Sequence, residues 1–447
     1  MMIARSLVLV LAAATAGVGA PPPLIDWEPC AGAPAALCAT LTLPVDWDDP
    51  DGETFGFDIA KLATPDQDNK IGTLIFGPGG PADSGVSRVA DGSSRFSDAL
   101  KSRFDIVSFD PRGVGRNKPL MCPQPPPSPV VPTDQADFDK IVTENRARWA
   151  QCRADLGAIF DHADTASTVR DLEALRAALG ERQLTFHGSS YGTLLGEQYA
   201  ETYPGRVRAM VLESSVDHSQ DTAGLLRTEA WALQDSFDAF VAWCDAEEAC
   251  ALHGKDVRRI WAEQMDRAPD PFAMTAAALR RLGAPDYPTL ADQLEGWAGG
   301  AAFPPVAIPP LNVPAYCADW ALPVRDYQEY ARLQRRAEQQ APDVRYSAGS
   351  VAVATCLGWP QPVANPQHRL EVHTRATLLQ INSVHDPASG YNWATEVNRQ
   401  LGRHGVLLTY AGAGHGSYNS SDCMRNTVDA YLIALTLPPR GTTCPAA

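Results

Sequence analysis

The chain has 447 residues, which is enough for one large α/β domain with an insertion or for two domains. Its 45% hydrophobic and 20% charged residues are the proportions of a globular protein that buries a core. The formal net charge of -16 argues against nucleic acid or an anionic membrane as a partner.

The first residues have the pattern of an export signal. A basic residue, Arg5, precedes an apolar, alanine-rich run over residues 7–16, and small residues suited to cleavage follow at 17–20. The run is too short to span a bilayer comfortably, and no cysteine comes just after it to carry a lipid. We therefore expect a signal peptide over residues 1–20, no membrane anchor, and a secreted or extracytoplasmic protein of a bacterial cell envelope.

The ten cysteines fit export. Their number is even, all lie beyond residue 20, and none forms the closely spaced C-x-x-C pair of a zinc site. The sequence leaves their connectivity open, and pairing each cysteine with its neighbour predicts five bridges: Cys30–Cys38, Cys122–Cys152, Cys244–Cys250, Cys317–Cys356 and Cys423–Cys444. We expect no metal and no organic cofactor.

Two short strands precede a buried strand at residues 71–76, which runs into the Gly/Pro-rich loop 77–85. A strand that ends in such a loop is where an α/β-hydrolase finds its second oxyanion amide. Gly79 and Gly80 are the candidates, because glycine lets the main chain approach the substrate closely. The alternative interpretation is a plain tight loop.

Another apolar strand, residues 104–109, ends in a glycine-containing turn. The turn lacks the G-K-[ST] of a phosphate loop, and no helical pattern follows it. We expect a turn supported by Asp110 and Arg112. The proline-rich residues 122–132 indicate an extended surface excursion, and a helix is predicted over 165–179.

The central motif follows that helix. An apolar run from residue 184 ends in Gly-Ser-Ser-Tyr-Gly at 188–192, and a helical pattern begins at once. This is the strand, sharp turn and helix of a nucleophile elbow, G-x-S-x-G. Ser190 is then the nucleophile, at the end of a strand, and the amide of Tyr191 points toward an oxyanion.

From residue 216 to residue 365 helical patterns dominate, with clear examples at 225–244 and 327–340. Before and after this segment, strands alternate with helices, as in a mostly parallel, doubly wound sheet. We therefore predict an α/β-hydrolase fold with a core in two parts, 21–215 and 366–447, and a helical lid insertion over 216–365.

Two further residues complete a catalytic constellation. Asp386 follows a strand predicted over 374–381, and His415 follows the last strand between two glycines. Serine, acid, histidine is the chain order of the α/β-hydrolase triad, and the carboxyl ends of the strands are where such sheets hold their sites. Asp386 could instead be a turn residue before a proline. His187, beside the elbow, is expected to point away from Ser190.

The order of several motifs resembles a known family. They are GPGGPADSG at 77–85, FDPRGVGRN at 109–117, GSSYGTLLG at 188–196 and CLGWP at 356–360, with the segment 377–415 after them. The chain resembles the exported tripeptidyl-aminopeptidase-like α/β-hydrolases of actinobacteria, relatives of the prolyl aminopeptidases. The matching stretches run from the third strand to the C-terminus and cover most of the mature chain.

The resemblance implies a triad of Ser190, Asp386 and His415, an oxyanion hole from the amides of Gly80 and Tyr191, and removal of short peptides from a free N-terminus. This chain departs from the family pattern at two places. Ala82 and Asp83 stand in the oxyanion loop where the family has glycines, and Glu213-Ser214-Ser215 stands where it has Asp-Gly after the sixth strand.

An aminopeptidase must also hold the substrate ammonium, which calls for carboxylates near the site. Glu213 and Asp217, just past a strand end, and Asp319 in the lid are the candidates, and each could instead be structural. The prediction is a secreted, monomeric serine exopeptidase that releases single residues, dipeptides or tripeptides from peptide substrates through an acyl-enzyme on Ser190. The alternatives are an exported carboxylesterase or lipase with the same triad, and an inactive binding protein on the same scaffold.

Overall fold

The computed structural model describes residues 25–81, 83–115, 131–269, 271–303, 313–360 and 362–447. The predicted signal peptide and Cys122 lie outside these residues. Ten strands form one sheet in the order β1-β2-β3-β5-β4-β6-β7-β8-β9-β10. The strands are β1 (Glu28–Cys30), β2 (Ala33–Pro44), β3 (Thr54–Leu62), β4 (Gly72–Gly77), β5 (Phe104–Phe109), β6 (Leu184–Ser189), β7 (Val207–Glu213), β8 (Leu378–His385), β9 (Gly405–Ala413) and β10 (Thr443–Cys444).

The sheet is antiparallel from β1 to β5 and parallel from there to β10. Successive side chains of a strand point to opposite faces, and the central strands place apolar residues on both faces because helices cover both. On β4, Ile75 packs into one core cluster, and Leu74 and Phe76 pack into the other. The predicted α/β-hydrolase architecture is confirmed.

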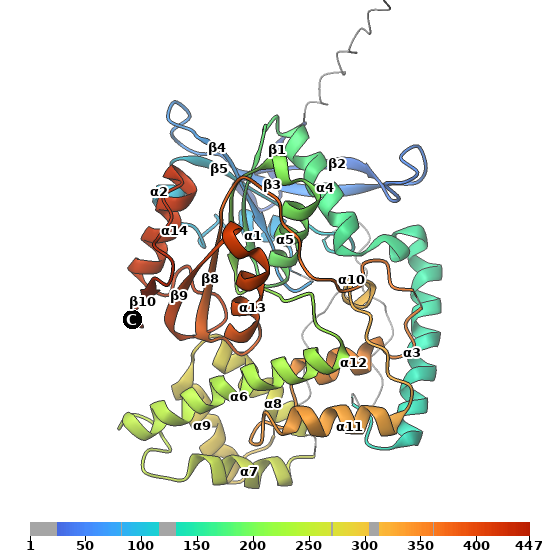
Figure 1. Ribbon diagram of the computed structural model, residues 1–447, viewed down its shortest axis with the longest axis vertical. Coiled ribbons are helices and arrows are strands. Elements are labelled where there is room, and N and C mark those ends of the chain that lie inside the picture. The colour runs from blue at the N-terminus through green and yellow to red at the C-terminus, as the bar shows by residue number, and fades with distance from the viewer. Residues whose placement is uncertain (1–24, 82, 116–130, 270, 304–312, 361) are drawn as a thin grey trace, which may run out of the picture.

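Helices cover both faces of the sheet (Figure 1). One core cluster contains apolar residues of α4 (Thr165–Ala178), α5 (Tyr191–Thr202) and α13 (Tyr391–Leu401), and the other contains residues of α2 (Asp98–Lys101) and α14 (Asp422–Ala434). The helix starts follow local chemistry. Asp164 caps α4 by accepting a hydrogen bond from the amide of Ser167.

Helices between β7 and β8 form a separate layer beyond the sheet (Figure 1), and we use the word lid for this helical layer. Its helices are α6 (Thr222–Ala246), α7 (Val257–Arg267), α8 (Pro271–Gly283), α9 (Tyr287–Ala298), α10 (Val313–Asp319), α11 (Tyr327–Glu338) and α12 (Ala348–Cys356). Helices α10 and α12 are the shortest of these helices, so little apolar periodicity marks them in the sequence.

A helix from outside the predicted insertion also belongs to the lid. Helix α3 (Gln135–Leu156) comes from the segment between β5 and β6, and its buried Trp149 lies in the same apolar cluster as residues of α6, α11 and α12. Asn145 of α3 donates hydrogen bonds to the carbonyl oxygens of Ala354 and Leu357, each at 3.0 Å. The lid is therefore assembled from two insertions.

Four of the predicted disulfides are confirmed: Cys30–Cys38, Cys244–Cys250, Cys317–Cys356 and Cys423–Cys444. Each closes a short stretch of chain, so each stabilises one local region. Within the described ranges, none of the helices combines the length and the apolar composition that crossing a membrane requires.

Candidate active site

The turn between β6 and α5 has the backbone of a nucleophile elbow. Ser190 lies at φ 55° and ψ -124°, a left-handed conformation that non-glycine residues rarely adopt. The tight turn explains the glycines on either side of it. A Cβ on Gly188 would lie 2.3 Å from the carbonyl oxygen of Gly192, and a Cβ on Gly192 would lie 2.2 Å from that of Gly77.

The loop after β4 lies against this elbow. A Cβ on Gly79 would come within 3.1 Å of the Cβ of Ser190, and Gly80 has φ 110°, so glycine suits both positions. Asp110, at the end of β5, supports the far end of the loop. Its Oδ1 accepts hydrogen bonds from the hydroxyl of Ser84 at 2.6 Å and from the amide of Val86 at 3.1 Å.

Arg112 connects the turn after β5 to helix α4 and to neighbouring loops. Its guanidinium is fully buried and makes a bidentate ion pair with Asp171 of α4, at 2.7 Å and 2.9 Å. It also donates to the carbonyl oxygens of Pro44, Val45 and His162. The expectation that Asp110 and Arg112 support this turn is confirmed.

His415 is paired with Asp386. The imidazole Nδ1 lies 2.9 Å and 3.0 Å from the two carboxylate oxygens, and Asp386 Oδ1 also accepts the amides of Ala388 and Ser389 at 2.9 Å each. Burial lowers the pKa of His415, but the charge of Asp386 and its hydrogen bond outweigh burial, so the pKa lies above its usual 6.5. Since Nδ1 is occupied, Nε2 is the nitrogen free to act on a nucleophile.

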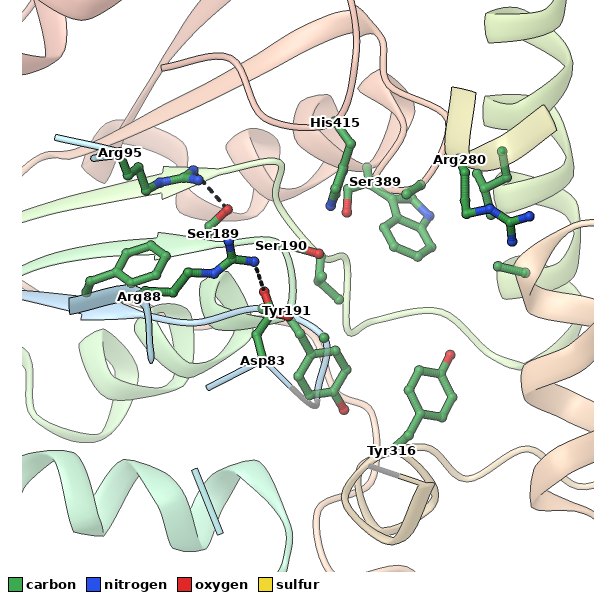
Figure 2. Close-up of a pocket in the computed structure, with 18 of the residues that line it drawn as sticks. Asp83, Arg88, Arg95, Ser189, Ser190, Tyr191, Arg280, Tyr316, Ser389 and His415 are labelled. Carbon is green, nitrogen blue, oxygen red and sulfur yellow. Dashed lines mark hydrogen bonds and ion pairs between the residues drawn. The ribbon is translucent and has the colours of Figure 1, made fainter. Parts of the chain in front are cut away.

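Ser190, Tyr191, Gly79, Gly80 and His415 all line one cavity of about 850 Å³. Figure 2 shows the imidazole of His415 directed toward the Ser190 side chain, and Tyr191 on the other side of the serine. The lid contributes apolar side chains to the wall, including Phe272, Leu279, Tyr316, Trp320 and Val351, and segments next to the sheet contribute others. The cavity therefore lies between the sheet and the lid, at the carboxyl ends of the strands.

Comparison with known proteins is consistent with this geometry. Residues 72–304, more than half of the chain, match the family described as alpha/beta hydrolase fold. The chain belongs to the α/β-hydrolase fold family. Residues 341–444 of the hydrolase match a second family, described as TAP-like protein. The protein is a hydrolytic enzyme, and its resemblance to tripeptidyl-aminopeptidase-like hydrolases is confirmed.

Three curated relatives align with almost the whole hydrolase. Serine protease Hip1 of Mycobacterium tuberculosis is 29% identical over 476 residues, covering 94% of this chain and 91% of the relative. Tripeptidyl aminopeptidase of Streptomyces lividans is 28% identical, with 94% and 86% covered. Carboxylesterase B of M. tuberculosis is 27% identical, with 92% and 86% covered. The names of these relatives include both peptidases and an esterase.

Glu213, expected to bind the substrate amine, does not line the cavity. It is 1% exposed, and its Oε1 accepts the amides of Ser417 and Tyr418, each at 2.8 Å. Its Oε2 is bonded to the guanidinium of Arg95 and lies 2.8 Å from Nε2 of His187. Protein donors occupy both oxygens, so the expectation for Glu213 is corrected: it is a structural carboxylate of the hydrolase core.

The expectation that Asp217 and Asp319 bind the substrate amine is corrected in the same way, because both residues are buried and neither lines the cavity. Asp217 accepts the hydroxyl of Ser219 at 2.6 Å. Asp319 accepts the hydroxyl of Tyr191 at 2.6 Å and the side-chain amide of Asn365 at 2.8 Å. Asp319 therefore connects the lid to the first residue of the elbow helix and does not reach the substrate space.

The sequence prediction missed a different carboxylate, Glu229 of α6. It lines the cavity, is 9% exposed, and its Oε2 has no hydrogen-bond partner among the described residues. Burial raises the pKa of Glu229 to about 8, against a lowering effect of the Gly349 amide. The signal was present in the sequence, because Glu229 shares a helical face with the buried Leu225, Leu226 and Leu233.

The described residues contain no group of three or more His, Cys, Asp or Glu side chains placed to hold a metal ion. The polar side chains that line the cavity also include Arg88, Arg95, Arg280, Asp83 and Asp91.

Proposed function

We propose that this hydrolase is an exported serine aminopeptidase that removes single residues or short peptides from free N-termini. The observation that carries the proposal is Glu229, a buried carboxylate without a full set of partners that lines the same cavity as Ser190. The names of two relatives, a serine protease and a tripeptidyl aminopeptidase, also support it.

The chemistry begins at Ser190. Its Oγ attacks the scissile carbonyl carbon while Nε2 of His415 takes the hydroxyl proton, and Asp386 holds the imidazole through Nδ1. The imidazolium then gives this proton to the leaving amine nitrogen as the C–N bond breaks. Water, activated by the same imidazole, attacks the acyl-enzyme ester, and the peptide acid leaves as Ser190 recovers its proton.

The negative charge on the carbonyl oxygen needs donors during both steps. Tyr191 is the first residue of α5, so its amide has no partner within the helix and lies at the positive end of the helix dipole. The amide of Gly80 is the second proposed donor, on a loop that the elbow approaches closely. Each such donor is typically worth about 2.7–4 kcal/mol in the transition state.

Glu229 provides the selectivity for a free N-terminus. A buried carboxylate without a partner is unfavourable, and an ammonium group of the substrate would supply both the charge and the missing hydrogen-bond donors. The lid covers the cavity, so a chain end can enter more easily than the middle of a folded chain. Together these features favour exopeptidase activity.

Export is part of the proposal. It rests on the predicted signal peptide and on four disulfides, because such bonds persist in oxidising compartments and are rare in the cytosol.

A carboxylesterase is the second candidate. The largely apolar cavity wall, with Phe272, Leu279 and Val351, would also accept an acyl chain, and one relative is named Carboxylesterase B. An ester substrate has no ammonium, however, so this alternative leaves the buried Oε2 of Glu229 without a partner.

A substrate panel distinguishes the two candidates. Free-amine and N-acetylated mono-, di- and tripeptidyl chromogenic amides are compared with short and long acyl esters, with Ser190→Ala as control. We expect cleavage of free-amine peptides that is lost on acetylation and absent in the Ser190→Ala variant. Turnover of esters alone, or indifference to acetylation, would contradict the aminopeptidase proposal.

A further inference from the structure

The loop that carries His415 is held by two side chains from another strand. The three residues after the histidine are Gly416, Ser417 and Tyr418, and their amides all point toward the end of β7. Gly416 donates to Oγ of Ser214 at 3.0 Å, and Ser417 and Tyr418 both donate to Oε1 of Glu213 at 2.8 Å. Three consecutive amides are thus fixed by two adjacent residues.

The same two residues hold the other parts of the site. The carbonyl oxygen of Glu213 accepts the amide of Ser190 at 2.9 Å. The amide of Ser214 donates to the carbonyl of Ile381 on β8, the strand that leads to Asp386, at 3.0 Å. The end of β7 therefore contacts the nucleophile turn, the strand that precedes the acid, and the histidine loop.

The second carboxylate oxygen of Glu213 also has protein partners, and one of them carries a positive charge. Oε2 pairs with the guanidinium of Arg95, which also donates to Oγ of Ser189 at 3.1 Å, beside the nucleophile. Burial keeps the pKa of His187 well below its usual value, so its neutral ring donates from Nε2 to the same oxygen. A buried charge with this number of donors holds a fixed position.

We propose that Glu213 and Ser214 are positioning residues: they set the place of His415 relative to Ser190 without touching substrate. The inference rests on the proposed use of His415 as the base of Ser190. Neither Glu213 nor Ser214 lines the cavity, so their effect must pass through the histidine loop. A displacement of a catalytic group by about 1 Å can reduce the rate by about 100-fold, so anchoring of this kind matters.

The choice of variant decides the test. Glu213→Ala would leave the guanidinium of Arg95 and the amides of Ser417 and Tyr418 without their acceptor and could fail to fold. Ser214→Gly avoids this problem, because Ser214 has φ 58°, a conformation that glycine adopts without strain. The variant removes the hydroxyl that accepts a hydrogen bond from the amide of Gly416, and it relieves the backbone strain at this position. Leu435→Gly is the matched control, since Leu435 has φ 57° at the end of α14 and its side chain is 49% exposed.

The main readout needs no peptide substrate. A fluorophosphonate probe forms a bond from Ser190 Oγ to phosphorus and releases fluoride, and His415 takes the serine proton. The labelling rate is measured against pH for wild type, Ser214→Gly and Leu435→Gly, together with the melting temperature and, on the best amide substrate, kcat and KM.

For Ser214→Gly we expect labelling slower by about tenfold or more on the high-pH plateau, an equal fall in kcat and a change in KM within about twofold. The melting temperature should not fall, and Leu435→Gly should label at the wild-type rate. Labelling of Ser214→Gly at the wild-type rate would overturn the positioning role. Absence of labelling in folded wild type would instead refute the proposed function, so the two failures are distinct.

Discussion

Glu229→Gln tests whether this carboxylate binds the substrate amine. The side chain is 9% exposed, lines the cavity and has an oxygen without a partner, so glutamine fills the same space without the charge. A hydrogen bond to a charged group typically contributes about 1.5–3 kcal/mol. Its loss should lower kcat/KM for a free-amine peptide amide by about 10- to 150-fold.

The assay compares each free-amine substrate with its N-acetylated counterpart in wild type and variant. We expect wild type to prefer the free amine and Glu229→Gln to lose most of that preference, because the acetylated substrate never used the charge. Glu263→Gln is the control, since Glu263 forms an exposed pair with Arg259 on the lid surface. If Glu229→Gln leaves the ratio of the two substrates unchanged, the amine-binding argument is refuted.

The pH dependence gives a second check on Glu229. Because burial raises its pKa to about 8, the empty cavity holds mainly the protonated acid below that pH. In wild type, kcat/KM for a free-amine substrate should therefore rise as pH approaches 8, and Glu229→Gln should keep only the part of this rise that comes from deprotonation of His415. A raised carboxyl pKa in the folded state makes the protein less stable as pH rises from about 4.5 toward 8. Glu229→Gln should therefore melt at a higher temperature than wild type at pH 8.

Three further changes test the catalytic groups and their support. Asp386→Asn should lower kcat by about 1,000-fold or more. It should also move the acidic limb of the pH–rate profile to lower pH, because the carboxylate raises the pKa of His415. An unchanged pH–rate profile would contradict the pairing of Asp386 with His415. Arg112→Met should lower the free energy of unfolding, measured in urea, by about 3–5 kcal/mol, because it leaves Asp171 buried without its cation. A loss below about 1 kcal/mol would contradict the importance of this ion pair. Gly192→Ala should yield little folded protein by circular dichroism, because the added Cβ has no room, and normal yield would refute that reading of the elbow.

Local patterns explain what the sequence could predict. The elbow at Ser190 is specified by two glycines between an apolar strand and a helix, all within a few residues. Asp386 and His415 each follow a strand, and the sites of such sheets lie at the carboxyl ends of the strands, so their proximity could be predicted. Pairing neighbouring cysteines also succeeded, because each confirmed bridge closes a short loop.

Long-range packing explains what the sequence could not predict. Three of the residues that donate to the Glu213 carboxylate, Arg95, Ser417 and Tyr418, come from segments more than 100 residues away, so a carboxylate near a strand end could not be identified as structural. Helix α3 gives no sign in its own residues that it joins helices some 200 positions later through Asn145. Glu229 could have been identified as a candidate site residue, because a carboxylate on the apolar face of a helix is expected to be buried and requires an explanation.

The construction of the lid from two insertions limits how the enzyme can open. A lid carried on one insertion can swing on a single hinge, but here α3 and α6 share one apolar core with α11 and α12. The amide of His415 also donates to the carbonyl of Gly283 in the lid, and Asp319 holds Tyr191. A swinging motion would disturb the histidine and the elbow together. We therefore expect substrate and product to exchange through small rearrangements at the rim, and turnover to slow when the medium is made viscous.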